Sequence, residues 1–522
     1  MSWTPEARTD LATLPARVHL LIEPWVAATP DAIAVSDATG ALSYRAFAQA
    51  GARLAAQLRQ EGIKPGDRLI LICENCVAAA LFIFAASRCD AWIVPVNARM
   101  ARGEIDAIAA HSGARALFFT VAASREARAL SESFAARPFG FAEAGEISVC
   151  WPETARQPEK VEAAPEKQVA VLIYTSGTTG SPKGVMLSHR NLAYIAVAGA
   201  KVRATGPGDR IHCVLPVSHV YGIGSVLFGA LSNGARLDLV ARFTPAEMAR
   251  ALRDDAITVL YGVPAMYAKL LDYYRETGTA PLAPKLHAAR AGGAPLDLDL
   301  KQRFEAAFGL TLGNGYGLTE AAATVAATRP HSPRADCAVG QRLPDLDIEI
   351  RDDTGACVKC GEVGTLFVRG PNIMLGYYRD EAATRAVFDA RGFFDTGDLA
   401  REIDDQAIEI AGRMKELIIR SGFNVYPPDV EQAINAHPDV LQSAVVGRAV
   451  EGNEEVIAFV EAAPGRVIDA GALRGWLRER LAPYKIPSAI VVAALPVTST
   501  GKILKSKLKA VAGAPGFALK GL

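Results

Sequence analysis

Hydrophobic and polar residues alternate in helix-like and strand-like patterns along the first third of the chain. Apolar residues recur at helical spacing over 44–60, an apolar run at 67–73 predicts a strand, and the almost wholly apolar stretch 77–88 predicts a buried helix. Residues 116–119 predict a further strand. Helices and strands that alternate in this way indicate doubly wound α/β sheets, the fold class we expect for the large N-terminal part.

Nearer the C-terminus the pattern changes. Residues 361–378 form a β pattern punctuated by glycines. Beyond them, helices are predicted at 430–436 and 472–481 and strands at 442–447 and 456–461. Short helices and strands mixed over so few residues predict a small α+β domain at the end of the chain.

The composition narrows the classes of partner. Lys plus Arg and Asp plus Glu both number 56, so no net charge attracts nucleic acid or an anionic membrane, and we expect neither as a partner. No apolar stretch reaches the ~18 residues that span a bilayer. The pairs Cys73/Cys76 and Cys357/Cys360 lack accompanying His ligands, so we interpret them as structural thiols rather than redox or metal sites. This cysteine usage predicts a cytoplasmic protein.

The sequence YTSGTTGSPKG at 174–184 directly follows an apolar run at 169–173 that predicts a strand. Its glycines let backbone N–H groups face a bound anion, its hydroxyl side chains add donors and Lys183 adds a positive charge. We interpret it as a phosphate-binding loop, with a solvated turn as the alternative. The loop departs from the P-loop pattern, because Gly184 stands where Ser or Thr would hold magnesium. A metal ligand must therefore come from another segment.

A second segment, NGYGLTE at 314–320, supplies the groups that the loop lacks. The ring of Tyr316 can stack on a purine base, Thr319 can bond a phosphate oxygen, and Glu320 offers oxygen ligands to Mg²⁺. Alone, the segment would as readily be a surface turn. Its occurrence together with the phosphate loop favours a site for a nucleotide.

The loop at 174–184 resembles the signature loop of the AMP-forming, or adenylating, superfamily, which contains acyl-CoA synthetases, luciferases and peptide-synthetase adenylation domains. Matching motifs extend from about Tyr44 to Lys505. The resemblance implies a large N-terminal domain of doubly wound sheets with a barrel-like subdomain, followed by a small mobile α+β domain. We expect the N-terminal domain over 1–413, the mobile domain over 414–510 with its hinge at Lys415, and a tail over 511–522.

The same resemblance implies a set of nucleotide-binding residues. Asp398, in the motif GFFDTGDL, matches the carboxylate that binds both ribose hydroxyls, although such an Asp is otherwise commonly a turn cap. The segment before Pro295 resembles the wall against adenine. The whole set comprises Thr175, Ser176, Gly177, Thr178, Thr179, Gly180, Lys183, Gly293, Ala294, Pro295, Asn314, Gly315, Tyr316, Gly317, Asp398, Arg413 and Asn424.

Other residues are implied as catalytic or as contacts of the thiol substrate. Lys502 matches the lysine of the terminal motif, which serves the first half-reaction, and it would act with Thr319 and Glu320. Ser421, Gly422 and Phe423 match the strip that faces the pantetheine arm of coenzyme A. Apart from this motif, a lysine in the Lys-rich segment around Lys502 would be interpreted as solvated.

The motif LPVSHVYG is similar to the segment whose histidine lines or gates the acyl pocket, which makes His219 a candidate there. The pocket walls would be 217–225, 263–267, 292–295 and 318–325. These segments are small or apolar and contain no Arg or Lys. We therefore expect a fatty or aromatic monocarboxylic acid as the substrate, and the sequence does not choose between the two.

The resemblance implies a two-step ligation. The carboxylate attacks the α-phosphorus of ATP to give an acyl adenylate and pyrophosphate, and a thiol then displaces AMP. We expect coenzyme A as the thiol, Mg²⁺ on Glu320, and a monomer or homodimer. A luciferase-like oxygenase and a non-catalytic nucleotide-binding module stay open as alternatives. Oxygen uptake would indicate the oxygenase. The absence of Lys502, Glu320 or Asp398 from the sequence would indicate the non-catalytic module.

Overall fold

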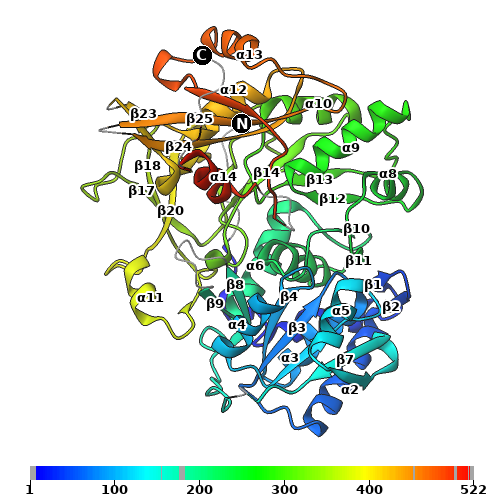
Figure 1. Cartoon of the computed structure of the whole chain (residues 1–522). Helices are drawn as coiled ribbons and strands as arrows, with labels where there is room; N and C mark the ends of the chain where they lie inside the picture. The colour runs from blue at the N-terminus through cyan, green and yellow to red at the C-terminus, as the bar shows by residue number, and fades with distance from the viewer. Residues whose placement is uncertain are drawn as a thin grey trace.

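The computed structural model describes residues 8–153, 156–175, 183–421, 423–450, 453–498, 503–514 and 517. A larger N-terminal domain holds two large mixed sheets, each with a parallel centre, and a smaller C-terminal domain lies against it (Figure 1). The predicted fold class is confirmed. In order along the chain, the helices are α1 (Glu23–Ala28), α2 (Tyr44–Gln60), α3 (Val77–Arg88), α4 (Arg102–Ser112), α5 (Arg125–Ser133), α6 (His189–Arg203), α7 (Gly229–Leu231), α8 (Pro245–Asp254), α9 (Pro264–Thr277), α10 (Leu298–Phe308), α11 (Glu381–Val387), α12 (Pro427–Asn435), α13 (Ala470–Arg478) and α14 (Lys505–Ala512).

The larger of the two sheets is nine-stranded, in the order β16-β15-β14-β13-β12-β10-β11-β1-β2. Its strands from β14 to β1 run parallel, and β2, β15 and β16 are antiparallel to their neighbours. The strands are β1 (Ile33–Asp37), β2 (Gly40–Ser43), β10 (Arg210–Cys213), β11 (Arg236–Leu239), β12 (Val259–Gly262), β13 (Ala288–Ala291), β14 (Leu312–Tyr316), β15 (Ala326–Ala327) and β16 (Gln341–Arg342).

The second sheet is eight-stranded, in the order β19-β9-β8-β4-β3-β5-β7-β6, with a parallel centre. Its central strand β3 is buried along its whole length, as expected for a parallel strand covered on both faces. The strands are β3 (Arg68–Cys73), β4 (Trp92–Asn97), β5 (Ala116–Phe119), β6 (Arg137–Gly140), β7 (Glu146–Cys150), β8 (Val169–Thr175), β9 (Lys183–Ser188) and β19 (Gly376–Tyr377).

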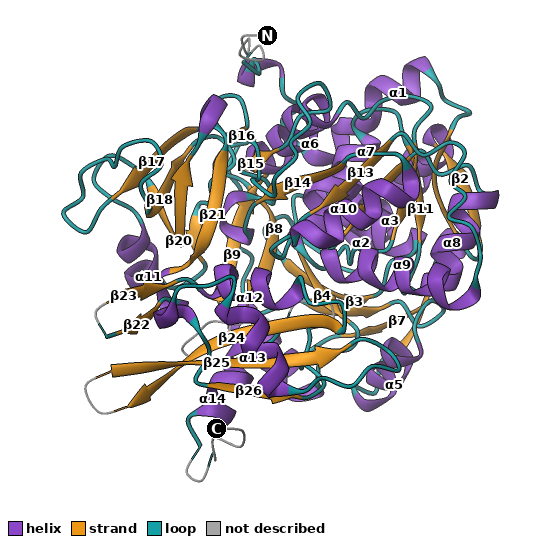
Figure 2. Cartoon of the chain, turned by 90° about the horizontal axis from the view of Figure 1, so that it is seen from above, coloured by secondary structure: helices purple, strands orange, loops and turns teal. Residues whose placement is uncertain are grey.

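One hydrophobic core joins both sheets. Helices α3 and α6 and the π-helix η4 (Tyr221–Phe228) contribute side chains to it together with strands of each sheet. Helix α3 buries almost every residue, which explains why it shows no polar face in the sequence. Helix α6 begins at a reciprocal cap in which Ser188 and Asn191 bond each other's backbone. These elements belong to the core that both sheets share, and Figure 2 shows α3 and α6 among the helices that lie beside the strands.

The segment with the Gly-punctuated pattern, 361–378, contributes β18 to a four-stranded antiparallel sheet, β17-β18-β20-β21, and β19 to the eight-stranded sheet. The C-terminal domain follows it, with a two-stranded hairpin β22-β23 and a three-stranded sheet β24-β25-β26. The bounds are β17 (Asp347–Arg351), β18 (Gly364–Arg369), β20 (Phe394–Glu402), β21 (Ile408–Arg413), β22 (Ile418–Arg420), β23 (Phe423–Val425), β24 (Val440–Val450), β25 (Asn453–Ala462) and β26 (Ala489–Val492).

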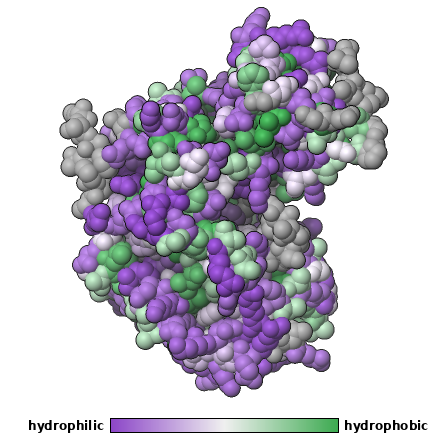
Figure 3. Space-filling view, turned by 90° about the vertical axis from the view of Figure 1, so that its left-hand side faces the viewer, coloured by the Kyte–Doolittle hydropathy of each residue, from purple (hydrophilic) through white to green (hydrophobic). Residues whose placement is uncertain are grey.

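The surface is predominantly polar. Hydrophobic residues are scattered over the face shown in Figure 3 and form no broad patch on it. Within the described residues, no helix combines the length and the apolar character needed to cross a bilayer. All eight cysteines are free; Cys73 and Cys76 are buried in the core, whereas Cys357 and Cys360 are exposed.

Candidate active site

The predicted site residues cluster beyond the carboxyl ends of parallel strands from both sheets. Thr175 ends β8, Tyr316 ends β14, and Gly292 and Gly293 directly follow β13. Ligands of open α/β sheets bind at this edge, because loops and helix N-termini converge there. The two sheets therefore direct their functional edges toward one region.

The phosphate-loop segment connects the antiparallel strands β8 and β9. Thr175 and Lys183 are register partners in this pair. Ser176, Gly177, Thr178, Thr179 and Gly180 lie outside the described residues. The Lys183 ammonium lies 4.7 Å from the centre of the Tyr377 ring, a cation–π distance.

Tyr316, Asp398 and Arg413 form a connected polar group. The Tyr316 hydroxyl donates to Asp398 Oδ2 at 2.5 Å, and Arg413 Nε lies 3.0 Å from Asp398 Oδ1. The two charged residues are register partners in β20 and β21, so backbone pairing fixes their separation. Burial, and after it the Asp398 charge, raises the pKa of Tyr316, which keeps its hydroxyl a donor at neutral pH.

Asp398 is 4 % exposed, so its carboxylate is presented by the protein rather than dispersed in water. The Tyr316 hydroxyl contacts one of its oxygens and Arg413 the other, and a carboxylate oxygen can accept more than one hydrogen bond. Such a carboxylate can accept two vicinal hydroxyl groups of a sugar.

Glu320 lies in the short 3₁₀ helix η5 (Thr319–Ala321), beside the phosphate-loop hairpin. Its Oε1 accepts a 3.0 Å hydrogen bond from the hydroxyl of Tyr377. Burial and the Glu320 charge raise the pKa of Tyr377, so that hydroxyl also stays protonated. Tyr377 thus contacts both Lys183 and Glu320. We did not predict it from the sequence, although the aromatic pair at 377–378 was a visible signal.

The Glu320 carboxylate fits a magnesium ion that is bound jointly by the protein and by the phosphates of a nucleotide. No cluster of three or more His, Cys, Asp or Glu side chains is found in the part of the chain that the structure describes. A protein cage for the metal is therefore not provided by these residues. Mg²⁺ commonly binds through one or two carboxylates, water and substrate phosphates, and Glu320 supplies such a carboxylate.

The turn around η5 is tight and strained. A Cβ atom at Gly317 would collide with the carbonyl oxygen of Ala323, so only glycine fits there. Ala322 and Ala323 have φ values of 49° and 105°, which side-chain-bearing residues rarely adopt. Backbone strain of this kind costs about 1–3 kcal/mol per residue and concentrates at functional sites. Thr319, 8 % exposed, is held within this turn.

Asn314 and Gly315 support the same turn from β14. The Asn314 side-chain amide donates to the Cys337 carbonyl at 2.7 Å, and its Oδ1 accepts from the Gly315 backbone N–H at 2.9 Å. Both bonds are internal, so in this structure the amide shapes the loop. Ala294 and Pro295 continue the loop after β13.

The predicted acyl segments also come together. The Tyr221 ring lies against Gly292, where a Cβ would be 3.2 Å from the ring, and Gly224 lies close to the Ala322 carbonyl. The hydroxyls of Ser225 and Thr324 are 2.9 Å apart. The segment 217–225 therefore contacts both 292–295 and 318–325, and a Cβ at Gly293 would lie 3.6 Å from Val263 of the fourth wall.

His219 lies just before the π-helix η4 and is half-buried. Its Nδ1 accepts a 3.2 Å hydrogen bond from the Tyr221 backbone N–H. This bond leaves the proton of a neutral imidazole on Nε2.

The predicted hinge Lys415 lies in the 3₁₀ helix η7 (Met414–Glu416), between β21 and β22. Ser421 has φ 52° and is fixed by a bond from its N–H to Asn453, while Phe423 stacks on Tyr484 with ring centres 4.6 Å apart. Asn424 is exposed in β23. The hairpin β22-β23 packs on β24, β25 and η8 (Pro483–Lys485), all within the C-terminal domain. Gly422 and Lys502 lie outside the described residues.

Lys505 connects this hinge region to the end of the chain. Its ammonium lies 3.0 Å from Glu416 and 2.8 Å from Glu431. Burial alone would lower the pKa of Lys505, but the two carboxylates raise it, so the group stays charged. Helix α14 is thereby attached to the segment that directly follows Lys415.

Comparison with known proteins adds independent information. The sequence profile described as AMP-binding enzyme matches residues 22–378, and the profile described as AMP-binding enzyme C-terminal domain matches residues 429–502. A feruloyl-CoA synthase from Amycolatopsis sp is 34% identical over 485 residues, which cover 92% of this chain and 96% of that protein. A long-chain-fatty-acid–CoA ligase from Bacillus subtilis is 35% identical over 350 residues, covering 66% of this chain and 62% of that protein.

Among solved structures, the O-succinylbenzoate coenzyme A synthetase from Bacillus subtilis in complex with ATP and magnesium ion superimposes with a TM-score of 0.79. It is 26% identical, and the alignment covers 94% of this chain and 99% of that one. The similarity thus extends over both domains.

Proposed function

The chain belongs to the family of AMP-binding enzymes as an adenylate-forming acid–thiol ligase of the ANL superfamily, and from this premise we propose which acid it activates and which residues act. The acid is a fatty or aromatic carboxylic acid. Its carboxylate attacks the α-phosphorus of ATP with release of pyrophosphate, and the acyl group then passes from AMP to coenzyme A. The feruloyl and fatty-acid ligases among its relatives support this range of acids.

The Tyr316–Asp398–Arg413 group carries the proposal for the nucleotide. We assign Asp398 to the ribose hydroxyls, with Tyr316 and Arg413 holding its carboxylate. Because all three side chains are preorganised by β14, β20 and β21, they pay little reorganisation cost when ATP binds. Asn424 and the loop from Gly293 to Pro295 complete the proposed contacts with AMP.

The phosphates are proposed to lie between the β8–β9 loop and η5. Lys183 and Glu320, both in contact with Tyr377, flank this space with opposite charges. A magnesium ion on Glu320 would neutralise phosphate charge and so lower the barrier to attack by an anion. Thr319 offers its hydroxyl to a phosphate oxygen.

The two half-reactions are proposed to use different faces of the C-terminal domain. Lys502 stabilises the developing charge during adenylation. A swing about Lys415 then replaces it with the strip of Ser421, Gly422 and Phe423, which faces the pantetheine arm. The domains accordingly comprise 1–413 and 414–510, and the tail 511–522. His219 binds or gates the acid.

The test is a screen of carboxylic acids for AMP release that requires both ATP and coenzyme A. The expected product is an acyl-CoA, formed in equal amount with AMP. Asp398→Asn serves as the matched variant, because it keeps the shape of the side chain and removes the charge. AMP release with oxygen uptake would favour an oxygenase, and nucleotide binding without turnover of any acid would contradict the proposal.

A further inference from the structure

Two arginines are buried side by side in the layer between the sheets. Arg203 is the last residue of α6 and is 6 % exposed, and Arg290, in β13, is 9 % exposed. The guanidinium of Arg290 donates to the backbone carbonyl of Arg203 at 3.4 Å. Two groups of like charge thus share one buried site.

Neither guanidinium has a carboxylate partner among the described residues. Arg203 donates to the Ser225 carbonyl at 3.5 Å, a long bond, and the Nε atoms of both arginines have no hydrogen-bond partner. The nearby groups are the aromatic ring of Tyr261, 6.0 Å from the Arg203 guanidinium, and other phenols. Burying a charge without a counter-charge is costly, so the site is electrostatically incomplete.

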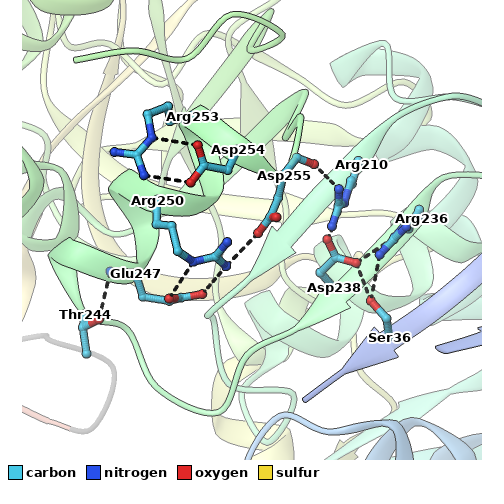
Figure 4. Close-up of polar contacts among 10 residues, drawn as sticks. All are labelled: Ser36, Arg210, Arg236, Asp238, Thr244, Glu247, Arg250, Arg253, Asp254 and Asp255. Atoms are coloured by element: carbon cyan, nitrogen blue, oxygen red, sulfur yellow. Dashed lines mark hydrogen bonds and ion pairs between the residues drawn. The ribbon is translucent and has the colours of Figure 1, made fainter. Parts of the chain in front are cut away.

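Other arginines in the same domain show the usual solution. In Figure 4, Arg210 and Arg236 both face Asp238, with N–O distances of 2.6 and 2.8 Å. Arg250 and Arg253 also face carboxylates in that view. These four lie nearer the surface, where an unpaired charge would cost less. Among these six arginines, the two buried ones, Arg203 and Arg290, are those without a carboxylate partner in the described ranges.

The space for the pair is provided by glycines from three elements. A side chain at Gly199 in α6 would lie 2.7 Å from the Arg203 guanidinium, and one at Gly313 in β14 would collide with that of Arg290. Gly229, at the start of α7, borders Arg203 as well. The backbone is therefore shaped around both guanidinium groups.

The pair is connected to residues of the proposed acyl walls. Arg203 bonds Ser225, whose hydroxyl is 2.9 Å from Thr324, and both of these residues belong to the proposed walls. Arg290 is the register partner of Tyr261, and the Tyr261 ring packs edge-on against Tyr221 at 6.4 Å. Arg203 and Arg290 are thus linked to the walls of the proposed acyl site through Ser225 and Tyr261.

We propose that Arg203 and Arg290 bind a second carboxylate at the far end of the acid, so that the substrate is a dicarboxylic acid activated at one end only. This inference rests on the proposed ligase function. Guanidinium groups match the planar, two-oxygen geometry of a carboxylate. The negative charge of the substrate carboxylate would be the counter-charge that the described residues of the protein do not provide. The expectation of a monocarboxylate relied on four wall segments, and both arginines come from outside them.

The test uses pairs of acids that differ only in the distal carboxylate: straight-chain diacids with monoacids of equal length, and 4-carboxycinnamate with cinnamate. The wild-type enzyme should prefer the diacid in at least one pair by about tenfold or more in kcat/KM, as expected for a bond to a charged group. Arg290→Met and Arg203→Met should each remove this preference, mainly through the KM of the diacid. Arg290→Lys should retain part of it.

Arg236→Met is the matched control, because it removes a carboxylate-paired arginine from β11 of the same sheet and should leave the preference unchanged. Preference for the monoacid in every pair, or an equal loss of kcat/KM for the diacid and the monoacid in the two arginine variants, would overturn the inference.

A binding measurement without turnover tests the inference separately from the ligase proposal. The preferred diacid alone should raise the melting temperature of the wild-type protein and not of Arg290→Met, even if no AMP forms. Absence of that rise for every diacid would also overturn the inference.

Discussion

At the nucleotide end of the proposed site the buried carboxylate of Asp398 has Tyr316 and Arg413 as partners, whereas at the acyl end Arg203 and Arg290 have no carboxylate among the described residues. The first end is electrostatically complete before any ligand arrives, and the second becomes complete only with one. In this proposal, the carboxylate that already has partners in the protein binds ATP, which is used with every acid. The arginines without a carboxylate partner in the described part of the chain distinguish one acid from another.

The largest expected effect lies in the shared chemistry. Lys502→Ala should abolish adenylation, because one preorganised charge in such a site is worth on the order of 3 kcal/mol, a hundredfold or more in rate. Thioester formation from a supplied acyl adenylate should survive. Single-turnover assays of each half-reaction measure this, and uniform loss of both would contradict the assigned role.

Asp398→Asn should weaken the use of ATP equally for every acid. Loss of a bond to a charged group costs ~1.5–3 kcal/mol, so kcat/KM for ATP should fall roughly tenfold to a hundredfold. Steady-state kinetics with a diacid and its matched monoacid provide the measurement. A change in the ratio of kcat/KM for the diacid to kcat/KM for the monoacid would show that the nucleotide end also determines acid preference, which would contradict the distinction between the two ends.

Protein stability should also distinguish the arginine pair from an arginine whose donors are satisfied. Arg68 is fully buried, and it donates to the carbonyls of Gly66, Ser112 and Gly113 at 2.8–3.1 Å. Arg68→Met should therefore lower the melting temperature, because buried carbonyls lose their donors at ~1–3 kcal/mol. Arg290→Met should leave it unchanged or raise it, because it removes one of two like charges. Calorimetry without ligand measures the change in melting temperature for each variant. Equal decreases for Arg68→Met and Arg290→Met would indicate that the arginine pair stabilises the fold.

The smallest effect is expected at the hinge. Lys505→Met removes the ammonium between Glu416 and Glu431, and partly exposed ion pairs contribute about 1 kcal/mol or less each. Adenylation should slow by less than about tenfold, with no change in acid preference. A loss as large as that of Lys502→Ala in the same single-turnover assay would instead place Lys505 in the reaction.

Sequence patterns predicted the elements whose burial follows a simple period. The helices at 44–60 and 77–88 lie where apolar spacing placed them, and the strand expected at 67–73 begins one residue later. The strands expected at 442–447 and 456–461 belong to longer partners, Val440–Val450 and Asn453–Ala462, because pairing extends strands into polar residues that carry no apolar signal.

The site could be predicted only where its residues lie within one motif. Tyr316 and Asp398 were found through their motifs, but their mutual hydrogen bond spans 82 residues of sequence and no local pattern encodes it. Tyr377 joins Lys183 and Glu320 through equally long-range packing. Arg203 ends a helix and resembles an ordinary C-terminal charge, while Arg290 follows two alanines in a short strand. Only the fold brings these arginines together and removes water from both.

The origin of the oxygen atoms in AMP tests the ligase mechanism most directly. The acid is supplied with ¹⁸O in the carboxylate that is activated, and the products of ATP- and CoA-dependent turnover are analysed by mass spectrometry. Attack on the α-phosphorus, followed by thiol displacement at the acyl carbon, leaves one labelled oxygen on AMP and one in the acyl-CoA. Label in inorganic phosphate with formation of ADP, or AMP without label, would contradict an acyl-adenylate intermediate and with it the function proposed for this chain.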